Sequence, residues 1–422
     1  MNTHLPQMIR ITQKFDNTVL DNIPAKIRSQ INHWGFENEV QSGQTVAVAC
    51  SSRGIANFGT IVRTVISRLK NMGVLPFIVP AMGSHGAASG AGQKKVLEHL
   101  GIREAKVGAP IKSSLEVVRL GQTDEQIPVY LDKLASEADH IVLINRIKEH
   151  TDFEYEFESG LLKMMAIGLG KQEGAARYHE AMMTYGYPEV ILSVARKLIQ
   201  HVPILFGVGI VENGYGQTAD IGICPVDEIE EMEKVLFKLA KSMAPCLPFD
   251  DADILIIDEM GKDISGTGFD TKVVGRIGLP LITPEPKRPK IKRLVVCDLT
   301  TGSEGNALGV GIADMITQRL LDKIDMQALN INSITGVCPE MGKIPLTLEN
   351  DREALEVAIK SVGLIPRERL KIMRIKNTAF LNEVDVSEAY AKELSARGDL
   401  KISLNKRPIA FDQKGNFESF SK

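Results

Sequence analysis

Cysteine is scarce in this sequence, and its cysteines do not form a metal-binding pattern. The five residues Cys50, Cys224, Cys246, Cys297 and Cys338 are odd in number, widely separated and free of CxxC spacing. This usage argues against structural zinc and iron–sulfur sites and indicates a reducing compartment. We therefore expect a cytoplasmic protein.

Aromatic residues and long apolar runs are also lacking. Aromatic content is 5% with a single tryptophan, Trp34, so there is no stacking platform for single-stranded nucleic acid. No apolar run reaches the roughly 18–20 residues that span a bilayer, and the N-terminal segment lacks the apolar core of a signal peptide. The formal net charge of -3 gives no electrostatic reason for a nucleic-acid or membrane partner, and we expect neither.

What is present is the composition of a globular protein of more than one domain. Hydrophobic residues make up 44% and charged residues 24% of the 422 positions. This length exceeds one ordinary core. The clearest boundary is Ala244–Asp253, which carries two prolines and three aspartates. We predict an N-terminal α/β domain over residues 1–245, with the catalytic and cofactor-attachment residues, and a C-terminal α/β domain over 246–422.

Short β-branched runs alternate with amphipathic runs along both predicted domains. This rhythm predicts an α/β fold of two lobes, each a mostly parallel sheet covered by helices, with an active site in the cleft between them. Expected first-domain strands are Thr45–Cys50, Pro76–Pro80, His140–Asn145, Ile204–Asn213 and Thr218–Cys224. Expected helices there are Phe58–Gly73, Lys94–Leu100, Ser193–His201 and Pro225–Met243. In the second domain we expect strands Asp253–Met260 and Lys292–Leu299, and helices near Ala313–Ile324 and Arg352–Val362.

Two loops after expected strands carry polar groups suited to binding or proton transfer. The loop after the first strand contains Ser51, Ser52 and Arg53, whose hydroxyls and guanidinium suit a carboxylate or phosphate. The alternative is that this loop caps a helix and Arg53 is solvated. The loop PAMGSHGAAS places His85 among small residues that leave room for a ligand. The alternative there is a tight turn in which the histidine is incidental.

The segment Asn145–Glu180 follows another expected strand and contains two histidines and a lysine. His150 can act as a general acid or base near neutral pH, or belong to a charged surface loop. Lys163 stands alone in an apolar run, where burial is costly unless the amine is paired or used; otherwise it extends from an amphipathic helix. His179 can bind a transition metal or lie on a helix surface. Because ligands bind at the carboxyl ends of parallel strands, we expect these groups and His85 to converge on one cofactor.

Common nucleotide and hydrolase motifs are missing. The glycine-rich runs Ser265–Gly268 and Thr301–Gly309 have neither GxGxxG nor GxxxxGK[ST] spacing. The sequence also has no GxSxG elbow and no HExxH pair. These absences exclude the usual dinucleotide, P-loop, α/β-hydrolase and zinc-protease interpretations.

Taken in order, the candidate residues resemble the nickel-pincer-nucleotide lactate racemase family of 2-hydroxyacid racemases and epimerases. The resemblance covers most of the chain in length, two-lobed layout and motif order. Arg53 matches the family's arginine loop, and the Gly-Ser-His run ending at His85 matches its Gly-x-His loop. His150 and the Ser-Gly stretch that leads to Lys163 match its second catalytic histidine and its lysine. His179, sixteen residues after that lysine, matches its nickel ligand.

The resemblance implies a role for each of these residues. Lys163 would hold a pyridinium-3,5-dithiocarboxylic-type mononucleotide, the nickel-pincer nucleotide, and His179 would complete the coordination of nickel. His85 and His150 would be catalytic and face the substrate from opposite sides. Arg53 would hold a substrate carboxylate.

Three further positions complete the expected site. Ser51 and Ser52 are expected to bind the cofactor. Lys272, in SGTGFDTK, is a loose counterpart of the family's second-lobe lysine and is expected to bind substrate. The implied partners are a small-molecule substrate and the proteins that synthesise the cofactor.

The implied reaction is isomerisation: inversion of the hydroxyl-bearing C2 of a 2-hydroxyacid by proton-coupled hydride transfer to the lysine-bound nucleotide. A proton beside an ionised carboxylate is weakly acidic, so removal of a hydride by an electrophilic ring is the easier route. Two bases, one on each side of the substrate, suit a reaction that interconverts two enantiomers.

Departures from the family bear on the substrate. Cys50 stands where the family has an acidic residue, and an acidic EYEFES run separates His150 from Lys163. These changes concern substrate recognition more than cofactor attachment, so a larger 2-hydroxyacid or an aldonic acid is an expected substrate. Two other functions stay open: a nickel-free, non-catalytic binder of a small acidic metabolite, and a hydroxyacid enzyme that binds its nucleotide reversibly.

Overall fold

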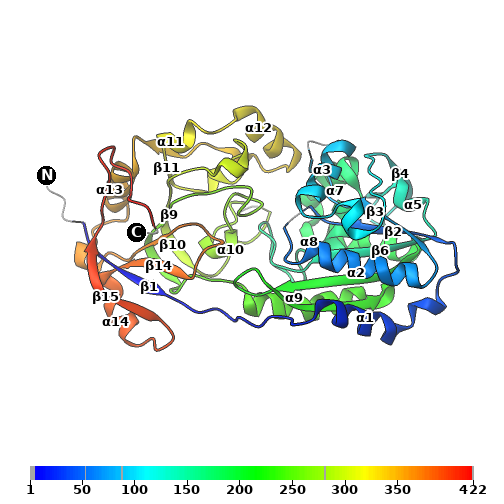
Figure 1. Cartoon of the computed structure of the whole chain (residues 1–422). Coiled ribbons are helices and arrows are strands. Elements are labelled where there is room, and N and C mark those ends of the chain that lie inside the picture. The colour runs from blue at the N-terminus through cyan, green and yellow to red at the C-terminus, as the bar shows by residue number, and fades with distance from the viewer. Residues whose placement is uncertain (1–4, 53, 87–88, 280–281, 421–422) are drawn as a thin grey trace. The chain divides into compact units, whose positions relative to one another are not determined.

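A computed structural model describes residues 5–52, 54–86, 89–279 and 282–420 of the chain (Figure 1). The chain divides into two compact units. We call Asp16–Ala244 the N-terminal unit, and Met1–Phe15 together with Pro245–Lys422 the C-terminal unit. The division after Ala244 falls at the start of the predicted proline- and aspartate-rich boundary.

Residues 5–15 belong to the C-terminal unit, whereas the sequence predicts that they are part of the N-terminal domain. Strand β1 (Gln7–Thr12) pairs antiparallel with β14 (Glu383–Ser387) and β15 (Lys401–Pro408). Ile9 and Ile11 are buried, while Arg10 Nε lies 2.5 Å from Asp385 Oδ1. The pairing depends on residues more than 370 positions away, which local sequence does not reveal.

The N-terminal unit is built on a sheet in the order β3-β2-β6-β7-β8. All neighbours are parallel except β7 and β8, which form the expected hairpin. The strands are β2 (Thr45–Cys50), β3 (Leu75–Pro80), β6 (His140–Arg146), β7 (Ile204–Glu212) and β8 (Thr218–Pro225). A separate hairpin is formed by β4 (Val117–Gln122) and β5 (Pro128–Asp132).

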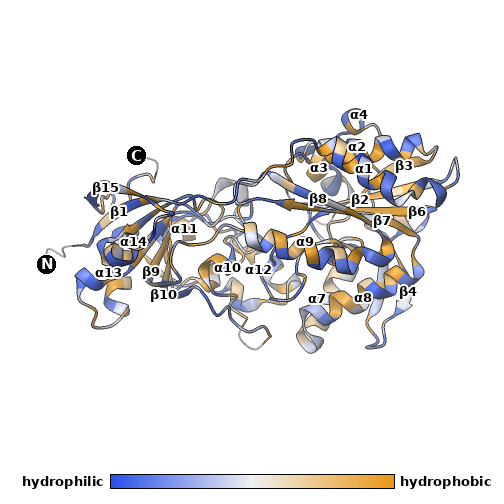
Figure 2. Cartoon of the chain, turned by 90° about the horizontal axis from the view of Figure 1, so that it is seen from below, coloured by the Kyte–Doolittle hydropathy of each residue, from blue (hydrophilic) through white to orange (hydrophobic). Residues whose placement is uncertain are grey.

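Helices cover both faces of this sheet. Figure 2 shows α1, α2, α3 and α4 on one side of its strands and α7, α8 and α9 on the other. The helices of the unit are α1 (Ile23–Trp34), α2 (Phe58–Asn71), α3 (Gly90–His99), α4 (Glu104–Val107), α5 (Lys133–Ser136), α6 (Leu161–Lys163), α7 (Lys171–Tyr185), α8 (Tyr187–His201) and α9 (Ile229–Met243). Because both faces are covered, the strands are continuously apolar and buried, as parallel strands usually are.

The C-terminal unit contains a mixed sheet in the order β12-β11-β10-β9-β13-β14-β1-β15. From β12 to β13 neighbouring strands are parallel, and the remaining pairs are antiparallel. Its other strands are β9 (Asp251–Ile257), β10 (Lys290–Val296), β11 (Met315–Thr317), β12 (Leu346–Leu348) and β13 (Ile372–Ile375). Its helices are α10 (Thr271–Val274), α11 (Gln318–Leu321), α12 (Met326–Thr335), α13 (Asp351–Ser361) and α14 (Ala391–Ser395).

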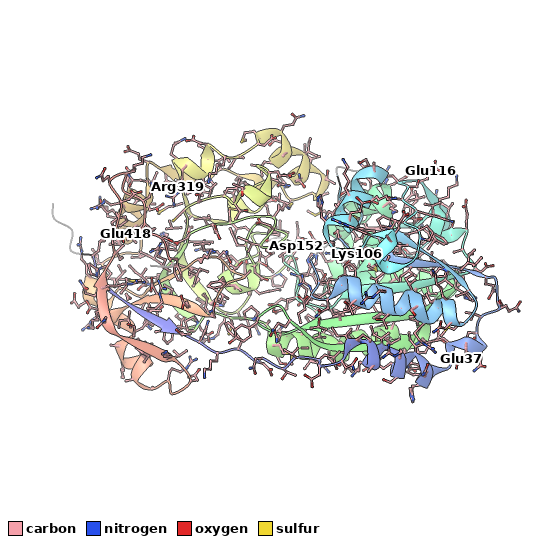
Figure 3. All side chains as sticks on the ribbon, in the orientation of Figure 1. Glu37, Lys106, Glu116, Asp152, Arg319 and Glu418 are labelled. Atoms are coloured by element: carbon pink, nitrogen blue, oxygen red, sulfur yellow. The ribbon has the colours of Figure 1, made fainter. Side chains whose placement is uncertain are left out.

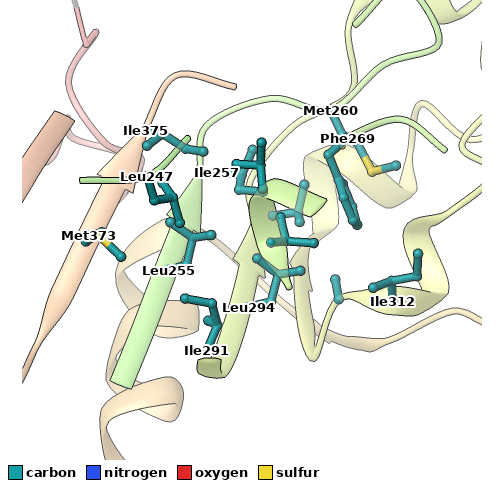
Figure 4. Packing of buried hydrophobic residues seen from close by; sticks show 14 of the residues in the cluster. Leu247, Leu255, Ile257, Met260, Phe269, Ile291, Leu294, Ile312, Met373 and Ile375 are labelled. Carbon is teal, nitrogen blue, oxygen red and sulfur yellow. The ribbon is translucent and has the colours of Figure 1, made fainter. Parts of the chain in front are cut away.

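Alternate side chains of these strands build two cores. Leu255 and Ile257 of β9 face one core, while Ile254 and Ile256 face the other. Figure 4 shows the first core, where Leu255 and Ile257 lie with Phe269 and other apolar groups. The expected α/β lobes with mostly parallel sheets covered by helices are therefore confirmed.

One expected helix is wrong. The run Ala313–Ile324 contains the buried strand β11, which pairs with β10 and β12, and only then the short helix α11. Thr317 ends the strand, and its hydroxyl accepts the N–H of Leu320 at 3.3 Å, so the helix begins after it. The β-branched residues of this run favoured a buried strand more than its apolar spacing favoured a helix. Within the described residues, no helix has the length and apolarity needed to cross a membrane.

Candidate active site

The sequence-predicted residues of the N-terminal unit follow three neighbouring strands at one edge of its sheet. Cys50, the last residue of β2, is in register with Pro80 of β3 and Ile144 of β6. Ser51 and Ser52 follow β2, His85 follows β3, and His150 follows β6. The carboxyl ends of parallel strands are the usual ligand-binding edge of an open α/β sheet. This edge thus carries Ser51, Ser52, His85 and His150.

His85 and Ser52 meet at this edge. Ser52 Oγ lies 2.5 Å from His85 Nδ1, and the histidine side chain is exposed. A hydroxyl on one ring nitrogen orients an imidazole and selects its tautomer. His85 is therefore contacted by a residue from another strand end, and its catalytic role stays a prediction.

His150 and Lys163 also meet. Lys163 Nζ contacts His150 Nε2, and both side chains are half-buried. The backbone N–H of Asp152 donates to His150 Nδ1 at 3.0 Å. The ring of Phe153 stacks on His150 with a centroid distance of 4.8 Å. Lys163 thus directs its amine to the imidazole, which answers the alternative of a lysine extending from an amphipathic helix.

A buried glutamate shapes the loop that carries His150. Glu158 is fully buried, and its carboxylate accepts the N–H of His150 at 2.6 Å and of Tyr155 at 3.3 Å. Lys148 and Ser159 exchange two backbone hydrogen bonds that close the loop. Asp152 on this loop lies at the opposite end of the unit from Glu37, which precedes the sheet (Figure 3). Glu158, which belongs to the acidic run that departs from the family pattern, therefore holds the backbone of the His150 loop.

Another buried glutamate anchors the segment that carries Lys163. Glu233 of α9 is fully buried, and its Oε2 accepts the N–H groups of Leu161 at 2.6 Å and Leu162 at 3.0 Å. Burial raises the pKa of Glu233 to about 7, and these two backbone hydrogen bonds oppose the rise. Lys163 ends helix α6 and is followed directly by the π-helical turn η2 (Met164–Gly168). Such turns are frequent at functional sites.

The loop of His85 packs on this same segment. Gly83 donates its N–H to the carbonyl of Gly168 at 3.2 Å. A Cβ on Gly83 would lie 3.4 Å from Ile167 Cγ2, and the φ of +59° also favours glycine. The two sequence motifs are thus joined through η2.

His179 lies on α7, which approaches the same loop. A Cβ on Gly83 would be 3.7 Å from the Cβ of Ala175, and His179 is four residues further along, on the same helix face. The histidine is half-buried. Within the described part of the chain, no group of three or more His, Cys, Asp or Glu side chains could hold a metal. The nickel role of His179 stays a prediction.

The structure gives fewer contacts for the other predicted residues, Ser51, Arg53 and Lys272. Ser51 is buried, and its hydroxyl has no hydrogen-bond partner among the described residues. Arg53 lies outside the described residues. Lys272 lies on α10 in the C-terminal unit, where its N–H donates to Asp270 Oδ1 at 2.9 Å. Its proposed role, like that of Arg53 and of a cleft between the lobes, stays a prediction.

Sequence reasoning missed the buried charged residues that support the site: Glu158, Glu233 and a third group around Lys171. Glutamate and lysine are mostly exposed in proteins, and these three lie in charged or glycine-rich runs that look solvated. The only signal was the closeness of Glu158 and Lys171 in sequence to the expected histidine and lysine; Glu233, which is 70 residues beyond Lys163, gave none.

A sequence model of the lactate racemase N-terminal domain matches residues 5–188. Residues 5–188 are therefore similar to the lactate racemase N-terminal domain. The matched residues include each of the strand-end loops described above. No functionally curated protein sequence matches the chain.

Solved structures extend the likeness to most of the chain. The lactate racemase apoprotein from Thermoanaerobacterium thermosaccharolyticum has a TM-score of 0.52 at 12% identity, with 89% of this chain and 99% of that chain covered. A protein from Thermotoga maritima has a TM-score of 0.55 at 14% identity, covering 87% and 99%. These matches show that the chain has the lactate racemase fold. The resemblance to lactate racemases is thus confirmed for the fold, and residues 5–188 match the N-terminal domain of that family.

Proposed function

We propose that this protein is a 2-hydroxyacid racemase or epimerase that uses a nickel-pincer nucleotide attached to Lys163. The observation that carries the proposal is the contact between Lys163 Nζ and His150 Nε2 at the carboxyl edge of a lactate racemase N-terminal domain. The contact between Ser52 and His85 at the same edge supplies a second oriented imidazole. Family membership supports a racemase, and the specific reaction is our proposal.

The residues at this edge fit the cofactor. Lys163 offers an amine for attachment, on a segment fixed by Glu233. Ser51 offers a buried hydroxyl with no partner in the described residues, suited to a polar group of the nucleotide. His179 offers a further imidazole for nickel, whose other ligands would come from the nucleotide itself. The protein therefore needs only one metal ligand of its own.

The hydrogen bonds around His150 favour an amine in its reactive form. Since the N–H of Asp152 donates to Nδ1, the proton of the neutral ring lies on Nε2. A hydrogen bond between Nε2–H and Lys163 Nζ then requires the amine to accept, which only its unprotonated form can do. An unprotonated lysine amine is a nucleophile, as covalent attachment requires.

The imidazoles handle the substrate proton. When bound, the nucleotide supplies a pyridinium ring that accepts a hydride. One histidine takes the hydroxyl proton of the substrate as C2 becomes a keto carbon, and the proton returns when C2 is reduced from its other face. One of His85 and His150 would act on each enantiomer of the substrate. Arg53 and Lys272 are proposed to hold its carboxylate, which fixes C2 for transfer in either direction.

The proposed substrate is a 2-hydroxyacid or an aldonic acid, and cofactor-synthesis proteins are the proposed partners. The acidic run of the His150 loop and Cys50 in place of an acidic residue are the features that distinguish this site from that of a lactate racemase. An assay should therefore test other 2-hydroxyacids and aldonic acids in addition to lactate.

The test is to co-express the chain with nickel and the cofactor-synthesis proteins, then measure intact mass, bound nickel and inversion of a panel of 2-hydroxyacids and aldonic acids. Wild-type protein should carry an adduct and nickel and invert at least one acid. Lys163→Ala should lose all three. Lys133→Ala, which removes an exposed lysine paired with Glu116, should retain them.

Two outcomes would replace the proposal. Adduct-free, nickel-free wild-type protein under these conditions would indicate the non-catalytic binder. Nucleotide that dissociates on dialysis, without nickel, would indicate the hydroxyacid enzyme with a reversibly bound nucleotide. A Lys163→Ala variant that still holds stoichiometric nickel and inverts substrate would also overturn it.

A further inference from the structure

A fully buried charged network lies beneath the His85 loop. Lys171, the first residue of α7, and Asp132, the last of β5, both have no exposed surface, and Lys171 Nζ lies 2.7 Å from Asp132 Oδ2. The same amine donates to the carbonyl of Pro80 and, at 3.2 Å, to Gln93 Oε1. Gln93 of α3 is also fully buried. The network thus joins the ends of β3 and β5 with the helices α3 and α7.

This network is not expected to stabilise the core more than apolar residues would. Burial lowers the pKa of Lys171, and the ion pair with Asp132 only opposes that effect. Buried ion pairs are often no more stabilising than apolar residues of similar volume. Lys171 also has φ +53°, a left-handed conformation that costs a residue with a side chain about 1–2 kcal/mol. A glycine would avoid this strain but would lack the side-chain contacts of Lys171 with Asp132, Pro80 and Gln93.

The outer end of the network is the His85 loop. Gln93 Nε2 donates to the carbonyl of Gly83 at 2.8 Å and of His85 at 3.3 Å. Lys171 accepts no hydrogen bond, so its contact with Gln93 Oε1 fixes which way the amide faces. With the oxygen toward the lysine, the NH₂ group must point to the loop. The buried cation therefore determines the donor that holds His85.

The inner end of the network is the Lys163 segment. Asp132 donates its N–H to the carbonyl of Leu169 at 2.7 Å, directly after the turn η2. Gly83 in turn bonds to Gly168. The same few buried groups thus contact both the loop of one proposed catalytic histidine and the segment of the proposed attachment lysine.

We propose that Lys171 and Gln93 are positioning residues, which hold the His85 loop in register with the segment that carries Lys163. The consequence of this positioning for catalysis rests on the proposed function. The positioning itself does not, because Gln93 holds the loop by hydrogen bonds that exist in the protein without cofactor. Neither residue touches substrate in this role; each acts through the backbone of residues 83–85.

The test uses two variants that differ in how strongly they disturb the folded core. Gln93→Met keeps volume and burial but removes the amide that donates to the loop. Lys171→Met combined with Asp132→Asn removes both buried charges at once, so neither is left unpaired, and the asparagine can still accept the N–H of Ala135 as Asp132 Oδ1 does at 2.9 Å. Lys133→Met, the adjacent exposed lysine, is the matched control.

The first readout is amide hydrogen exchange of residues 82–86 in the full-length protein without cofactor. Both variants should exchange about tenfold faster there, with little change in β2 and β6, and the control should match wild type. The second readout is inversion by cofactor-loaded protein. Here kcat should fall about 10- to 100-fold with KM nearly unchanged, because a misplaced histidine affects transfer more than binding.

The two readouts separate the two proposals. Exchange of residues 82–86 that is equal in wild type and both variants overturns this inference, whatever the activity. Faster exchange in wild-type-like, folded variants supports it even if no acid is inverted. Loaded wild-type protein that inverts nothing overturns the proposed function alone.

Discussion

The carboxylate of Glu233 lies 2.6 Å from the backbone nitrogen of Leu161, across 72 residues of sequence. This contact places a buried acid at the start of the short helix that ends in Lys163. Since the four first N–H groups of a helix have no partner within it, an acceptor there fixes where the helix begins. The position of the proposed attachment lysine therefore depends on a residue of another helix.

Glu233 should make stability depend on pH. Its pKa is about 7 in the folded protein against 4.5 for a free glutamate, so between these values the folded state binds more protons than the unfolded state. Its effect on the free energy of unfolding is therefore most favourable below pH 4.5 and falls by about 3 kcal/mol as pH rises to about 7. Chemical denaturation between pH 4.5 and 8 should show this decline. It should be weaker in Glu233→Gln, while Glu230→Gln on the same helix should retain it.

Gly160 should not tolerate a side chain. A Cβ there would lie 2.3 Å from Glu233 Oε1 and 2.4 Å from its carboxyl carbon, so the carboxylate would have to leave the helix start. Gly160→Ala should destabilise the protein by about 1–3 kcal/mol and reduce the fraction carrying an adduct on Lys163. Thermal unfolding and intact mass measure the two effects. Gly398→Ala, where a Cβ meets nothing within 4 Å, is the control. Equal adduct in both variants would contradict the anchoring role.

Ser52 should matter for catalysis more than for stability. Removing its hydroxyl frees His85 Nδ1 from the partner that orients it, yet Ser52 is only half-buried. Ser52→Ala should lower kcat about tenfold and move the pH–rate profile, with less than about 1.5 kcal/mol of lost stability. Ser52→Thr keeps the hydroxyl and should recover most of the rate. The prediction fails if Ser52→Ala has a wild-type rate and profile.

Arg374 should hold the C-terminal segment on its unit. Its guanidinium pairs with Asp258 through two contacts of 2.7 Å, donates to the carbonyl of Glu418 at 2.8 Å, and lies 4.4 Å from the ring centroid of Phe417. Burial raises the pKa of Asp258 to about 6, and Arg374 opposes the rise. Arg374→Met leaves that carboxylate without its cation and should cost about 3–5 kcal/mol.

The same variant should expose residues 411–420 to proteases, because the segment loses both the hydrogen bond and the stacking contact. Limited proteolysis with mass spectrometry would locate the cuts. Lys376→Met, whose lysine lies 3.8 Å from Glu259 in a looser pair, should remain as resistant as wild type.

The five strands of the N-terminal sheet, and β9 and β10 of the C-terminal sheet, could be predicted because their burial follows from the local sequence. A strand covered on both faces is apolar along nearly its whole length, as in Thr45–Cys50 and Ile204–Glu212, and few other elements have this pattern. The prediction failed for a short element in which two local signals compete: in Met315–Thr317 the β-branched residues favour a strand and the apolar spacing favours a helix. The N-terminal strand Gln7–Thr12 failed for another reason: its partners lie at the other end of the chain.

The sequence by itself determined the main strands of the N-terminal sheet and the placing of Ser51, Ser52, His85 and His150 after strands, because hydrophobic periodicity and strand-end position are local properties. Only the tertiary structure decided which charged residues are buried beneath them. Glu158, Glu233 and Lys171 read as solvated residues in the chain, since an isolated charge is stable only in water. Their burial became possible when backbone N–H groups, an aspartate and a glutamine from distant segments were brought within hydrogen-bonding distance.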